Sequence, residues 1–210
     1  RWLIAHLSDD SASDGNTGNI AEAVVVSKST GVFCGRVPVD LLFAEWFPSC
    51  DLTWNVEEGD VITLGSQILS ISGPSDSVLS CERVVLNILG RLSGITTRTS
   101  EWVSESGSVS IACTRKTAWG LMDKWAVHVG GGLTHRLSRT DALMIKENDL
   151  KIIGSKQNTG SVISSAISSI DFEKSAAFVV IEVQDSAQAI SAAESWSENQ
   201  KIRGGEERIV

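Results

Sequence analysis

Three short segments between residues 113 and 148 carry side chains whose types and spacing could do chemistry. They are, in chain order, Cys113–Thr117 with Arg115 and Lys116, Gly130–Arg136 with His135 and Arg136, and Met144–Asn148 with Lys146. An Arg guanidinium matches a carboxylate with two parallel hydrogen bonds, whereas a Lys ammonium acts as a point charge on phosphate oxygens. From residue 111 to residue 146, six Lys or Arg stand against two acids, in a chain whose formal net charge is −8. The segments therefore predict a binding site for a small, highly anionic ligand.

The bulk composition restricts the class of protein. A length of 210 residues leaves room for one domain of good size or two small ones, with a sizeable core. With 42% hydrophobic and 21% charged residues, the chain is typical of soluble globular proteins. Its net negative charge argues against general binding of nucleic acid or of an anionic membrane surface. No apolar run approaches the length of about 18 residues that indicates a transmembrane helix.

The cysteines are predicted to be free thiols. The four lie at positions 34, 50, 81 and 113, without a CxxC pair and without the spacing of metal ligands. Because free thiols persist in reducing compartments, we expect the protein to be cytoplasmic.

The N-terminal third is predicted to form a small mixed domain. Short apolar runs predict strands at residues 23–27, 31–35, 52–56, 61–64 and 67–72. Helical spacing of apolar residues predicts a helix at 39–47, which stops before Pro48. The polar segment 57–60 lies between two strand-like runs and predicts a hairpin turn. We therefore assign residues 1–76 to an N-terminal domain, and a helix over residues 77–104 links it to a second domain at 105–210.

After residue 105 the pattern changes to strands that alternate with helices. Strands are predicted at 108–114, 143–146 and 177–183, with a fourth suggested near 133–136. Helices are predicted at 118–129, 161–170 and 187–196. Apolar strands that alternate with helices are typical of parallel β/α units, so the predicted fold class is α/β.

Charged side chains follow the strands of this second domain. Thr114, Arg115 and Lys116 come at the end of the first strand, Lys146 ends the second, and Glu182 lies near the end of the third. In a β/α barrel, the carboxyl ends of the strands form the mouth where chemistry takes place. We therefore expect these residues, together with His135 and Arg136, to gather at one rim.

Several separated motifs resemble the quinolinate phosphoribosyltransferases, also called carboxylating nicotinate-nucleotide pyrophosphorylases. The motifs are, in order, Glu82-Arg83, Asn87, Arg91–Thr97, Thr114–Thr117, Gly120-Leu121, Gly130–Gly132, His135-Arg136, Asp141 and Ile145–Asn148. The resemblance covers most of the chain and is specific, because many motifs match in the same order.

The resemblance implies a reaction, a fold and an assembly. The reaction converts quinolinate and phosphoribosyl pyrophosphate to nicotinate mononucleotide, pyrophosphate and CO2, with Mg2+ and without an organic cofactor. The implied fold is an N-terminal α/β sandwich domain followed by an open, parallel β/α barrel of the type II phosphoribosyltransferase kind. The implied assembly is a homodimer or higher homo-oligomer, in which the N-terminal domain of one subunit closes the active site of the next.

The resemblance also implies roles for individual residues. Arg115, His135 and Arg136 would hold the quinolinate carboxylates, with Thr114 beside them. Lys116 and Lys146 would reach phosphoribosyl pyrophosphate. Arg91 would be donated across the subunit interface to quinolinate. Glu182 would lie at the ribose and contact the metal indirectly, so that Lys116, Lys146 and Glu182 form the catalytic set.

The chain departs from the family pattern at several places. Cys113 stands where the family usually carries Asp, and Trp119–Met122 where it usually carries Pro-Gly-Leu-Arg. Residues 201–210 show neither the Leu-Asp-Asn strand end nor the Ser-Gly-Gly loop of the family. We therefore expect a C-terminally incomplete member with an incomplete barrel, whose 210 residues by themselves are not a competent enzyme.

Two other functions stay open at the level of the sequence. One is a related enzyme, either a nicotinate phosphoribosyltransferase or the molybdenum-transport-associated paralogue. The set of Arg91, Arg115 and Arg136 favours a dicarboxylate substrate over a monocarboxylate. The other is a degenerate barrel retained as a binding or assembly module. The intact basic set with Glu182 argues against such a module, because a purely structural role does not call for these residues.

Overall fold

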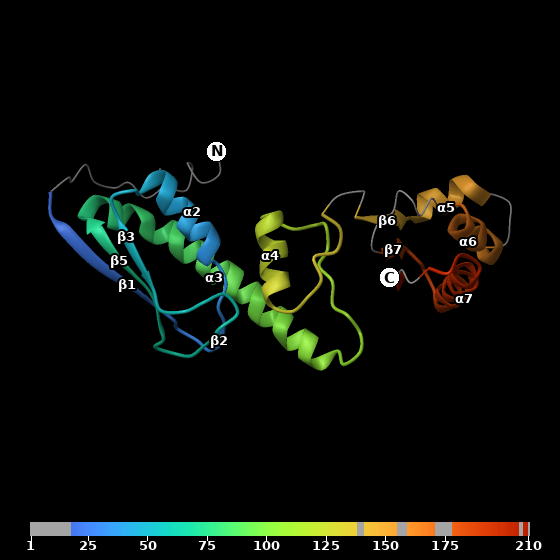
Figure 1. Cartoon of the computed structure of the whole chain (residues 1–210), viewed down its shortest axis with the longest axis horizontal. Helices are drawn as coiled ribbons and strands as arrows, with labels where there is room; N and C mark the ends of the chain where they lie inside the picture. Colours follow the sequence, from blue (N-terminus) through green and yellow to red (C-terminus); the bar gives the residue numbers. More distant parts are fainter. Residues whose placement is uncertain (1–17, 138–140, 155–158, 171–177, 206–207, 210) are drawn as a thin grey trace. The chain divides into compact units, whose positions relative to one another are not determined.

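The computed structural model describes residues 18–137, 141–154, 159–170, 178–205 and 208–209. They fall into two compact units, divided between Thr134 and His135. Each unit has its own sheets and its own hydrophobic core, and Figure 1 labels their elements. Within the described ranges, no helix combines the length and apolarity that crossing a lipid bilayer requires.

Antiparallel strands and two helices make up most of the first unit. Strands β1 (Ile20–Val26), β5 (Gln67–Pro74) and β3 (Asp51–Trp54) form one sheet in that order, and β2 (Gly31–Val32) pairs with β4 (Val61–Ile62). Helices α2 (Arg36–Trp46) and α3 (Ser75–Glu105) share a core with the sheet. The predicted strands and helices of this region are thus present, with shifted ends.

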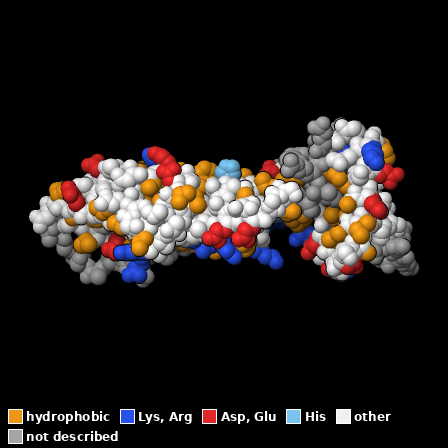
Figure 2. Space-filling view, turned by 90° about the horizontal axis from the view of Figure 1, so that it is seen from below, with side chains coloured by type: hydrophobic (Ala, Val, Ile, Leu, Met, Phe, Trp, Pro, Cys, Tyr) orange, Lys and Arg blue, Asp and Glu red, His pale blue; other side chains and the backbone are white. Residues whose placement is uncertain are grey.

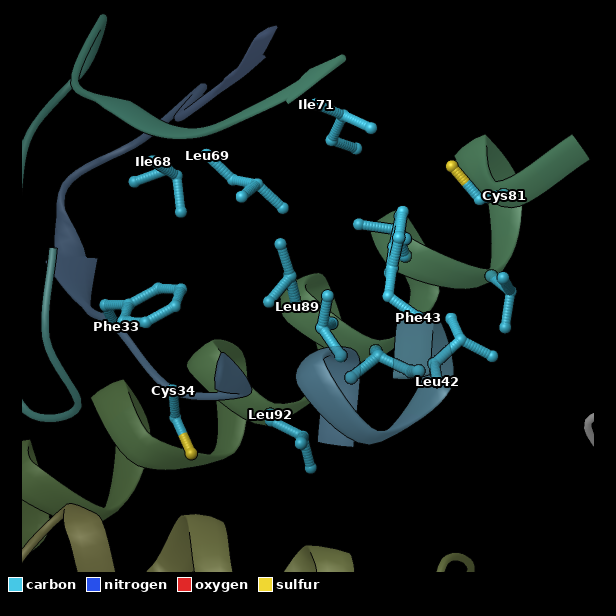
Figure 3. Packing of buried hydrophobic residues seen from close by; sticks show 14 of the residues in the cluster. Phe33, Cys34, Leu42, Phe43, Ile68, Leu69, Ile71, Cys81, Leu89 and Leu92 are labelled. Carbon is cyan, nitrogen blue, oxygen red and sulfur yellow. The ribbon is translucent and has the colours of Figure 1, made fainter. Parts of the chain in front are cut away.

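The core of the first unit forms because each element has an apolar face. On α3, Leu89 and Leu92 are buried. They share one cluster of buried residues with Leu69 and Ile71 of β5 and Phe43 of α2 (Figure 3). Full burial of one such side chain contributes about 1.5–3 kcal/mol, so this cluster is the main source of stability in the unit.

The segment Glu57–Asp60 turns the chain, but the predicted hairpin is wrong. Strand β3 before it pairs with β5, whereas β4 after it pairs with β2. The turn supports α2 instead. The Glu58 carboxylate accepts hydrogen bonds from the backbone N–H groups of Gly35 (3.1 Å) and Arg36 (2.9 Å), where that helix begins. A carboxylate there satisfies unpaired N–H groups and complements the helix dipole.

Helix α3 also packs against α4 (Leu121–Val129) (Figure 1). Thr96 on α3 is fully buried, and its hydroxyl donates to the carbonyl oxygen of Ala126 (2.9 Å). Gly130 follows α4 and permits this close approach, because a Cβ there would lie 2.6 Å from the Thr96 carbonyl oxygen. By contrast, a Cβ at Gly94 on α3 would meet no atom within 4 Å.

The second unit contains the parallel sheet that the sequence predicts. Strands β6 (Ala142–Ile145), β7 (Phe178–Ile181) and β8 (Arg208–Ile209) lie in that order, and both pairings are parallel. Helices α6 (Thr159–Ser168) and α7 (Ser186–Arg203) join its core through Ile163, Ile167 and Trp196. Helix α5 (Glu147–Gly154) was not predicted, because it is short and its first turn is polar and acidic.

The strand predicted at residues 108–114 is wrong. Ala112 forms an isolated parallel bridge with Leu133, framed by hydrogen bonds from Leu133 N to Ile111 O (2.8 Å) and from Cys113 N to Leu133 O (2.9 Å). A strand needs several successive residues paired with a neighbouring strand. The segment that turns back after Gly130–Gly132 supplies one paired residue, Leu133. The fourth strand suggested near 133–136 is reduced to the same bridge.

Two glycine substitutions test the packing of α3. We expect Gly130→Ala to destabilise the protein by about 1–3 kcal/mol, because the added methyl group overpacks the contact with Thr96 and Thr99. We expect Gly94→Ala to stabilise it by up to about 1 kcal/mol, because the site is open and Ala is the better helix former. Urea denaturation measures both changes. Equal effects of the two substitutions would contradict this packing.

Candidate active site

The basic loop, Thr114–Thr117, follows the Ala112–Leu133 bridge. Its residues Thr114, Arg115 and Lys116 are exposed. Oγ1 of Thr114 accepts a hydrogen bond from the backbone N–H of Lys116 (3.1 Å), which forms a local turn of a kind common for Thr. The loop therefore presents two positive side chains at its surface from a locally ordered backbone.

A buried lysine supports the start of the basic loop. Lys124 of α4 is 7% exposed, and its Nζ donates to the carbonyl oxygen of Thr134 (2.6 Å) and to Sγ of Cys113 (3.3 Å). Such partners are needed because a buried charge without hydrogen bonds is costly. We did not predict this role for Lys124, since its position on a helix does not show which segment its ammonium group reaches.

Arg91, a predicted substrate-binding residue, lies on α3 and bonds to Asp123 of α4. Its Nε donates to Oδ1 and its Nη2 to Oδ2, both at 2.8 Å. The Asp123 side chain is 5% exposed and the Arg91 side chain 34%. The backbone N–H of Trp119 also donates to Oδ2 (3.0 Å), and the guanidinium carbon lies 5.0 Å from the centre of the Trp119 ring. Asp123 therefore binds one edge of the Arg91 guanidinium, and the Trp119 ring covers one of its faces.

The Asp123 carboxyl is ionised in this arrangement. Burial by itself would raise its pKa, but the hydrogen bonds from Arg91 and from the backbone of Trp119 and Ala118 outweigh burial and lower the pKa below its usual value. The ion pair is therefore present throughout the neutral pH range.

Lys146 and Glu182 lie together at one edge of the parallel sheet. Ile145 pairs with Ile181 at the ends of β6 and β7, and the next residues are Lys146 and Glu182. The backbone N–H of Glu182 donates to the carbonyl oxygen of Ile145 (2.9 Å). Both charged residues are exposed at the carboxyl ends of their strands. This juxtaposition is the one predicted from their positions in the sequence.

Asp149 orders the backbone beside Lys146. Its Oδ2 accepts from the backbone N–H of Lys146 (2.8 Å), across the first turn of α5. A carboxylate that reaches back to the residue before a helix acts as a cap. The cap explains why the chain turns from β6 into α5 directly after Lys146.

His135 and Arg136 begin the second unit with an unusual backbone. His135 has a φ of 57°, in a region that non-glycine residues seldom occupy and that occurs at functional sites. Its Nδ1 accepts from the backbone N–H of Arg136 (2.6 Å). Arg136 Nη1 donates to the carbonyl oxygen of Ala142 (3.2 Å) at the start of β6. Asp141 accepts from the backbone N–H of Leu137 (2.9 Å), which fits a scaffold role.

The predicted site residues thus fall into two groups. Arg91, Thr114, Arg115 and Lys116 lie in the first unit, whereas His135, Arg136, Lys146 and Glu182 lie in the second. The structure brings Lys146 and Glu182 to one sheet edge. The gathering of all eight residues at one rim stays a prediction. The described residues add Asp123, Trp119 and Lys124 as supports, which pattern reasoning missed because each acts through a distant segment.

The described residues on the face drawn in Figure 2 carry charges of both signs. In Figure 2, Lys and Arg side chains lie next to Asp and Glu side chains, with apolar side chains between them. A hollow of about 370 Å³ in the first unit is lined by residues of β1 and α3, among them Val25, Ser93 and Thr97, and includes none of the predicted site residues. The predicted chemistry therefore rests on exposed side chains of the loop and the sheet edge.

The residues that the structure describes contain no cluster of three or more His, Cys, Asp or Glu that could hold a metal ion. Glu182 nevertheless offers an exposed carboxylate at the strand edge. Mg2+ in phosphate-transferring enzymes commonly takes one or two carboxylates and completes its shell with substrate phosphates and water. The donor set therefore fits a Mg2+ that arrives with a phosphorylated substrate, and does not fit a preformed metal cage.

Two family models match consecutive parts of the chain. The model described as the N-terminal domain of quinolinate phosphoribosyl transferase matches residues 10–93, and the model of its C-terminal domain matches residues 95–199. The second match by itself spans half of the 210 residues. The chain belongs to the quinolinate phosphoribosyltransferase family. The resemblance drawn from the sequence motifs is thereby confirmed.

Curated members of the family are similar over most of the chain. It is 37% identical over 153 residues to the decarboxylating quinolinate phosphoribosyltransferase 1b of Nicotiana tabacum, covering 72% of this chain and 42% of the relative. It is 36% identical over 179 residues to a probable carboxylating nicotinate-nucleotide pyrophosphorylase of Archaeoglobus fulgidus, covering 82% and 65%. The chain thus spans less than half the length of the tobacco relative.

Solved structures of the family share the fold. NadC from Streptococcus pyogenes superimposes with a TM-score of 0.74 at 30% identity, covering 99% of this chain and 81% of that chain. The nicotinate-nucleotide pyrophosphorylase from Francisella tularensis gives a TM-score of 0.74 at 26% identity, covering 93% and 70%. The predicted α/β fold class, with an N-terminal α/β domain and a barrel-type C-terminal domain, is confirmed.

The Arg91–Asp123 pair predicts that the stability lost on replacing Asp123 depends on pH. A carboxyl whose pKa is lowered on folding contributes stability above its unfolded pKa of about 3.9, and loses it as the pH falls through the folded value. We expect Asp123→Asn to cost about 1–3 kcal/mol at pH 7. The gap to the unsubstituted protein should narrow as the pH falls below about 4, because the carboxyl of the unfolded state takes up a proton there before that of the folded state does. Urea denaturation at several pH values measures this difference in the free energy of unfolding.

The exposed Arg98–Glu101 pair on α3 is a matched control. Its side chains are 64% and 50% exposed. We expect Glu101→Gln to cost less than about 1 kcal/mol. A gap for Asp123→Asn that stays constant down to pH 3 would contradict the assignment.

Proposed function

We propose that the protein takes part in the transfer of a phosphoribosyl group from phosphoribosyl pyrophosphate to quinolinate, with loss of CO2. The products are nicotinate mononucleotide, pyrophosphate and CO2, and the pathway is the biosynthesis of NAD. Support comes from the family membership and from the names of the relatives. The observation that carries the proposal is the juxtaposition of Lys146 and Glu182 at the carboxyl edge of a parallel sheet.

The proposed binding residues divide between the two substrates. Arg115, His135 and Arg136 hold the two carboxylates of quinolinate, with Thr114 beside them, since guanidinium forks match carboxylates. Lys116 and Lys146 contact phosphate oxygens as point charges. Arg91 contacts quinolinate from a neighbouring subunit. Glu182 faces the ribose, where a carboxylate stabilises developing positive charge.

The proposed chemistry relies on positioning and charge. The bond from the ribose C1 to pyrophosphate breaks, the quinolinate nitrogen bonds to C1, and the transition state has oxocarbenium character. The lysines stabilise the leaving pyrophosphate, and the bound geometry replaces a bimolecular encounter. The ring nitrogen is then cationic, so it stabilises the electron pair that CO2 leaves on the adjacent ring carbon. That carbon then takes a proton from water, which completes its C–H bond.

We include Mg2+ in the proposal as a companion of phosphoribosyl pyrophosphate. Glu182 is the residue that would contact it, indirectly. When bound, the ion would neutralise charge on the pyrophosphate and orient it.

We further propose a homodimer or higher homo-oligomer with shared active sites. Arg91 can serve a neighbouring subunit only in such an assembly. Exposed apolar side chains on α2 and α4, including Leu41 (67%) and Leu121 (69%), are of the kind that protein partners cover. Sedimentation at several concentrations tests this proposal, and a monomer throughout would contradict it.

The cytoplasm remains the proposed compartment. All four cysteines are free, and burial raises the pKa of Cys34 and of Cys81 to about 12, so these two thiols are unreactive. Free thiols of this kind suit a reducing compartment.

Substrate use tests the function directly. The purified protein is incubated with phosphoribosyl pyrophosphate, Mg2+ and either quinolinate or nicotinate, and binding and product are followed by calorimetry and chromatography. We expect quinolinate to bind, and to bind more tightly than nicotinate. Formation of nicotinate mononucleotide would show that the 210 residues are competent by themselves, contrary to the expectation from the sequence. Equal affinity for nicotinate would remove the reason for choosing a dicarboxylate, and binding of neither would contradict the proposal.

The two substrates should respond differently to loss of Lys116. We expect Lys116→Ala to weaken the binding of phosphoribosyl pyrophosphate by about tenfold or more, because a charge-assisted contact is lost. The affinity for quinolinate should change less. Lys201→Ala, which removes an exposed lysine near the end of α7, is the control and should leave both affinities unchanged. The opposite ranking for Lys116→Ala would show that its assigned role is wrong.

A further inference from the structure

The contact between Arg91 and Asp123 uses one edge of the guanidinium. Nε and Nη2 each donate one hydrogen bond of 2.8 Å to the two carboxylate oxygens. A guanidinium has five N–H donors in a planar fork. The contact with Asp123 takes two of them, and the outer edge, formed by Nη1 and the second N–H of Nη2, lies outside this ion pair. That outer edge has the same fork geometry, which matches a second carboxylate.

The two side chains of the Arg91–Asp123 pair differ in their exposure to solvent. The Asp123 side chain is 5% exposed, whereas the Arg91 side chain is 34% exposed. The carboxylate therefore anchors the pair in the interface between α3 and α4, and the guanidinium extends toward the surface. A free Arg side chain loses rotamer entropy when a ligand orders it, and an anchored one has already lost much of that entropy before a ligand arrives.

Trp119 restrains the remaining freedom of Arg91. Its ring lies 5.0 Å from the guanidinium carbon, so it covers one face of the group. The backbone of Trp119 also donates to Asp123 (3.0 Å), which ties the segment after the basic loop to the same carboxylate. Arg91 and the loop that carries Arg115 and Lys116 are therefore ordered by one buried anion.

We propose that Asp123 is a positioning residue for the dicarboxylate substrate: it holds Arg91 side-on, so that the outer edge of the guanidinium receives a substrate carboxylate. The inference rests on the proposed function and adds to it a residue that does not touch the substrate. Trp119 assists by fixing the plane of the guanidinium. The arrangement favours a dicarboxylate because Arg91 adds a guanidinium fork to those of Arg115 and Arg136 in the site that it serves.

A purely Coulombic role for Asp123 predicts the opposite sign. Removal of an anion raises the local positive charge, which by itself would tighten the binding of quinolinate. Positioning predicts weaker binding, because an unanchored guanidinium must be ordered by the ligand. The sign of the change therefore separates the two roles.

The experiment measures quinolinate and nicotinate affinities of the purified protein by calorimetry. We expect Asp123→Asn to weaken quinolinate binding by about tenfold or more, and nicotinate binding by less than about twofold. Arg91→Lys keeps the charge but lacks the fork, and should weaken quinolinate binding similarly. The double variant should bind no more weakly than Arg91→Lys, because Asp123 acts only through Arg91. Asp123→Glu should recover part of the affinity.

Glu101→Gln is the matched control. Glu101 pairs with Arg98 (2.7 Å) on the same helix, and the Arg98 guanidinium carbon lies 5.2 Å from the centre of the Trp102 ring, but the pair is exposed. This variant should bind quinolinate as the unsubstituted protein does. Thermal unfolding of every variant separates lost affinity from lost fold. If Asp123→Asn does not fold, Asp123→Glu decides, because it keeps the anion beside Arg91 and changes the place at which that anion holds the guanidinium. A quinolinate affinity of Asp123→Glu equal to that of the unsubstituted protein would then contradict positioning.

The outcomes distinguish this inference from the proposed function. An unsubstituted protein that does not bind quinolinate would overturn both. Quinolinate binding that is unchanged or tighter in Asp123→Asn would overturn only the positioning role. Normal binding in Arg91→Lys would overturn the assignment of Arg91 to quinolinate and the positioning role with it. Additive losses in the double variant would assign Asp123 a role independent of Arg91 and would also overturn it.

Discussion

The burial of α3 on two sides is the constraint on which the first unit depends. Leu89 and Leu92 pack into the core formed with the N-terminal sheet and α2, while Thr96 lies fully buried against α4 and bonds to Ala126. In proteins most of the stability of a helix comes from tertiary packing rather than from its backbone hydrogen bonds, so these two packed faces are the main support of the 31-residue helix α3. The close approach of α4 in turn requires a glycine at position 130.

Two buried charged residues of α4 bind other segments of the first unit. Asp123 and Lys124 are adjacent on α4 and both buried, and each binds a different segment. Asp123 bonds to Arg91, and Lys124 bonds to Thr134 and Cys113. Buried charges are costly unless fully hydrogen-bonded, and such satisfied contacts specify one arrangement of the segments they join. The exposed loop with Arg115 and Lys116 is thus flanked by ordered chain on both sides.

In the second unit, strand pairing positions the charged side chains. Parallel pairing of β6 and β7 sets Ile145 opposite Ile181, so that Lys146 and Glu182 emerge at one edge. The register of the backbone pairing therefore positions these side chains, whereas a side-chain ion pair positions Arg91 in the first unit. Both kinds of support occur in this chain, whose similarity to NadC of Streptococcus pyogenes extends over 99% of its length.

The sequence by itself determined most of the strands and helices, the parallel arrangement of the second domain and the family, because apolar periodicity and ordered motifs are local signals. It also predicted that Lys146 and Glu182 follow the apolar cores of two parallel strands. Only the tertiary structure decided that Glu58 caps α2, that residues 108–114 pair through Ala112 rather than as a strand, and that Asp123 holds Arg91. These outcomes depend on contacts between residues 22 to 32 positions apart, or on the absence of enough strand partners, and no local pattern encodes them.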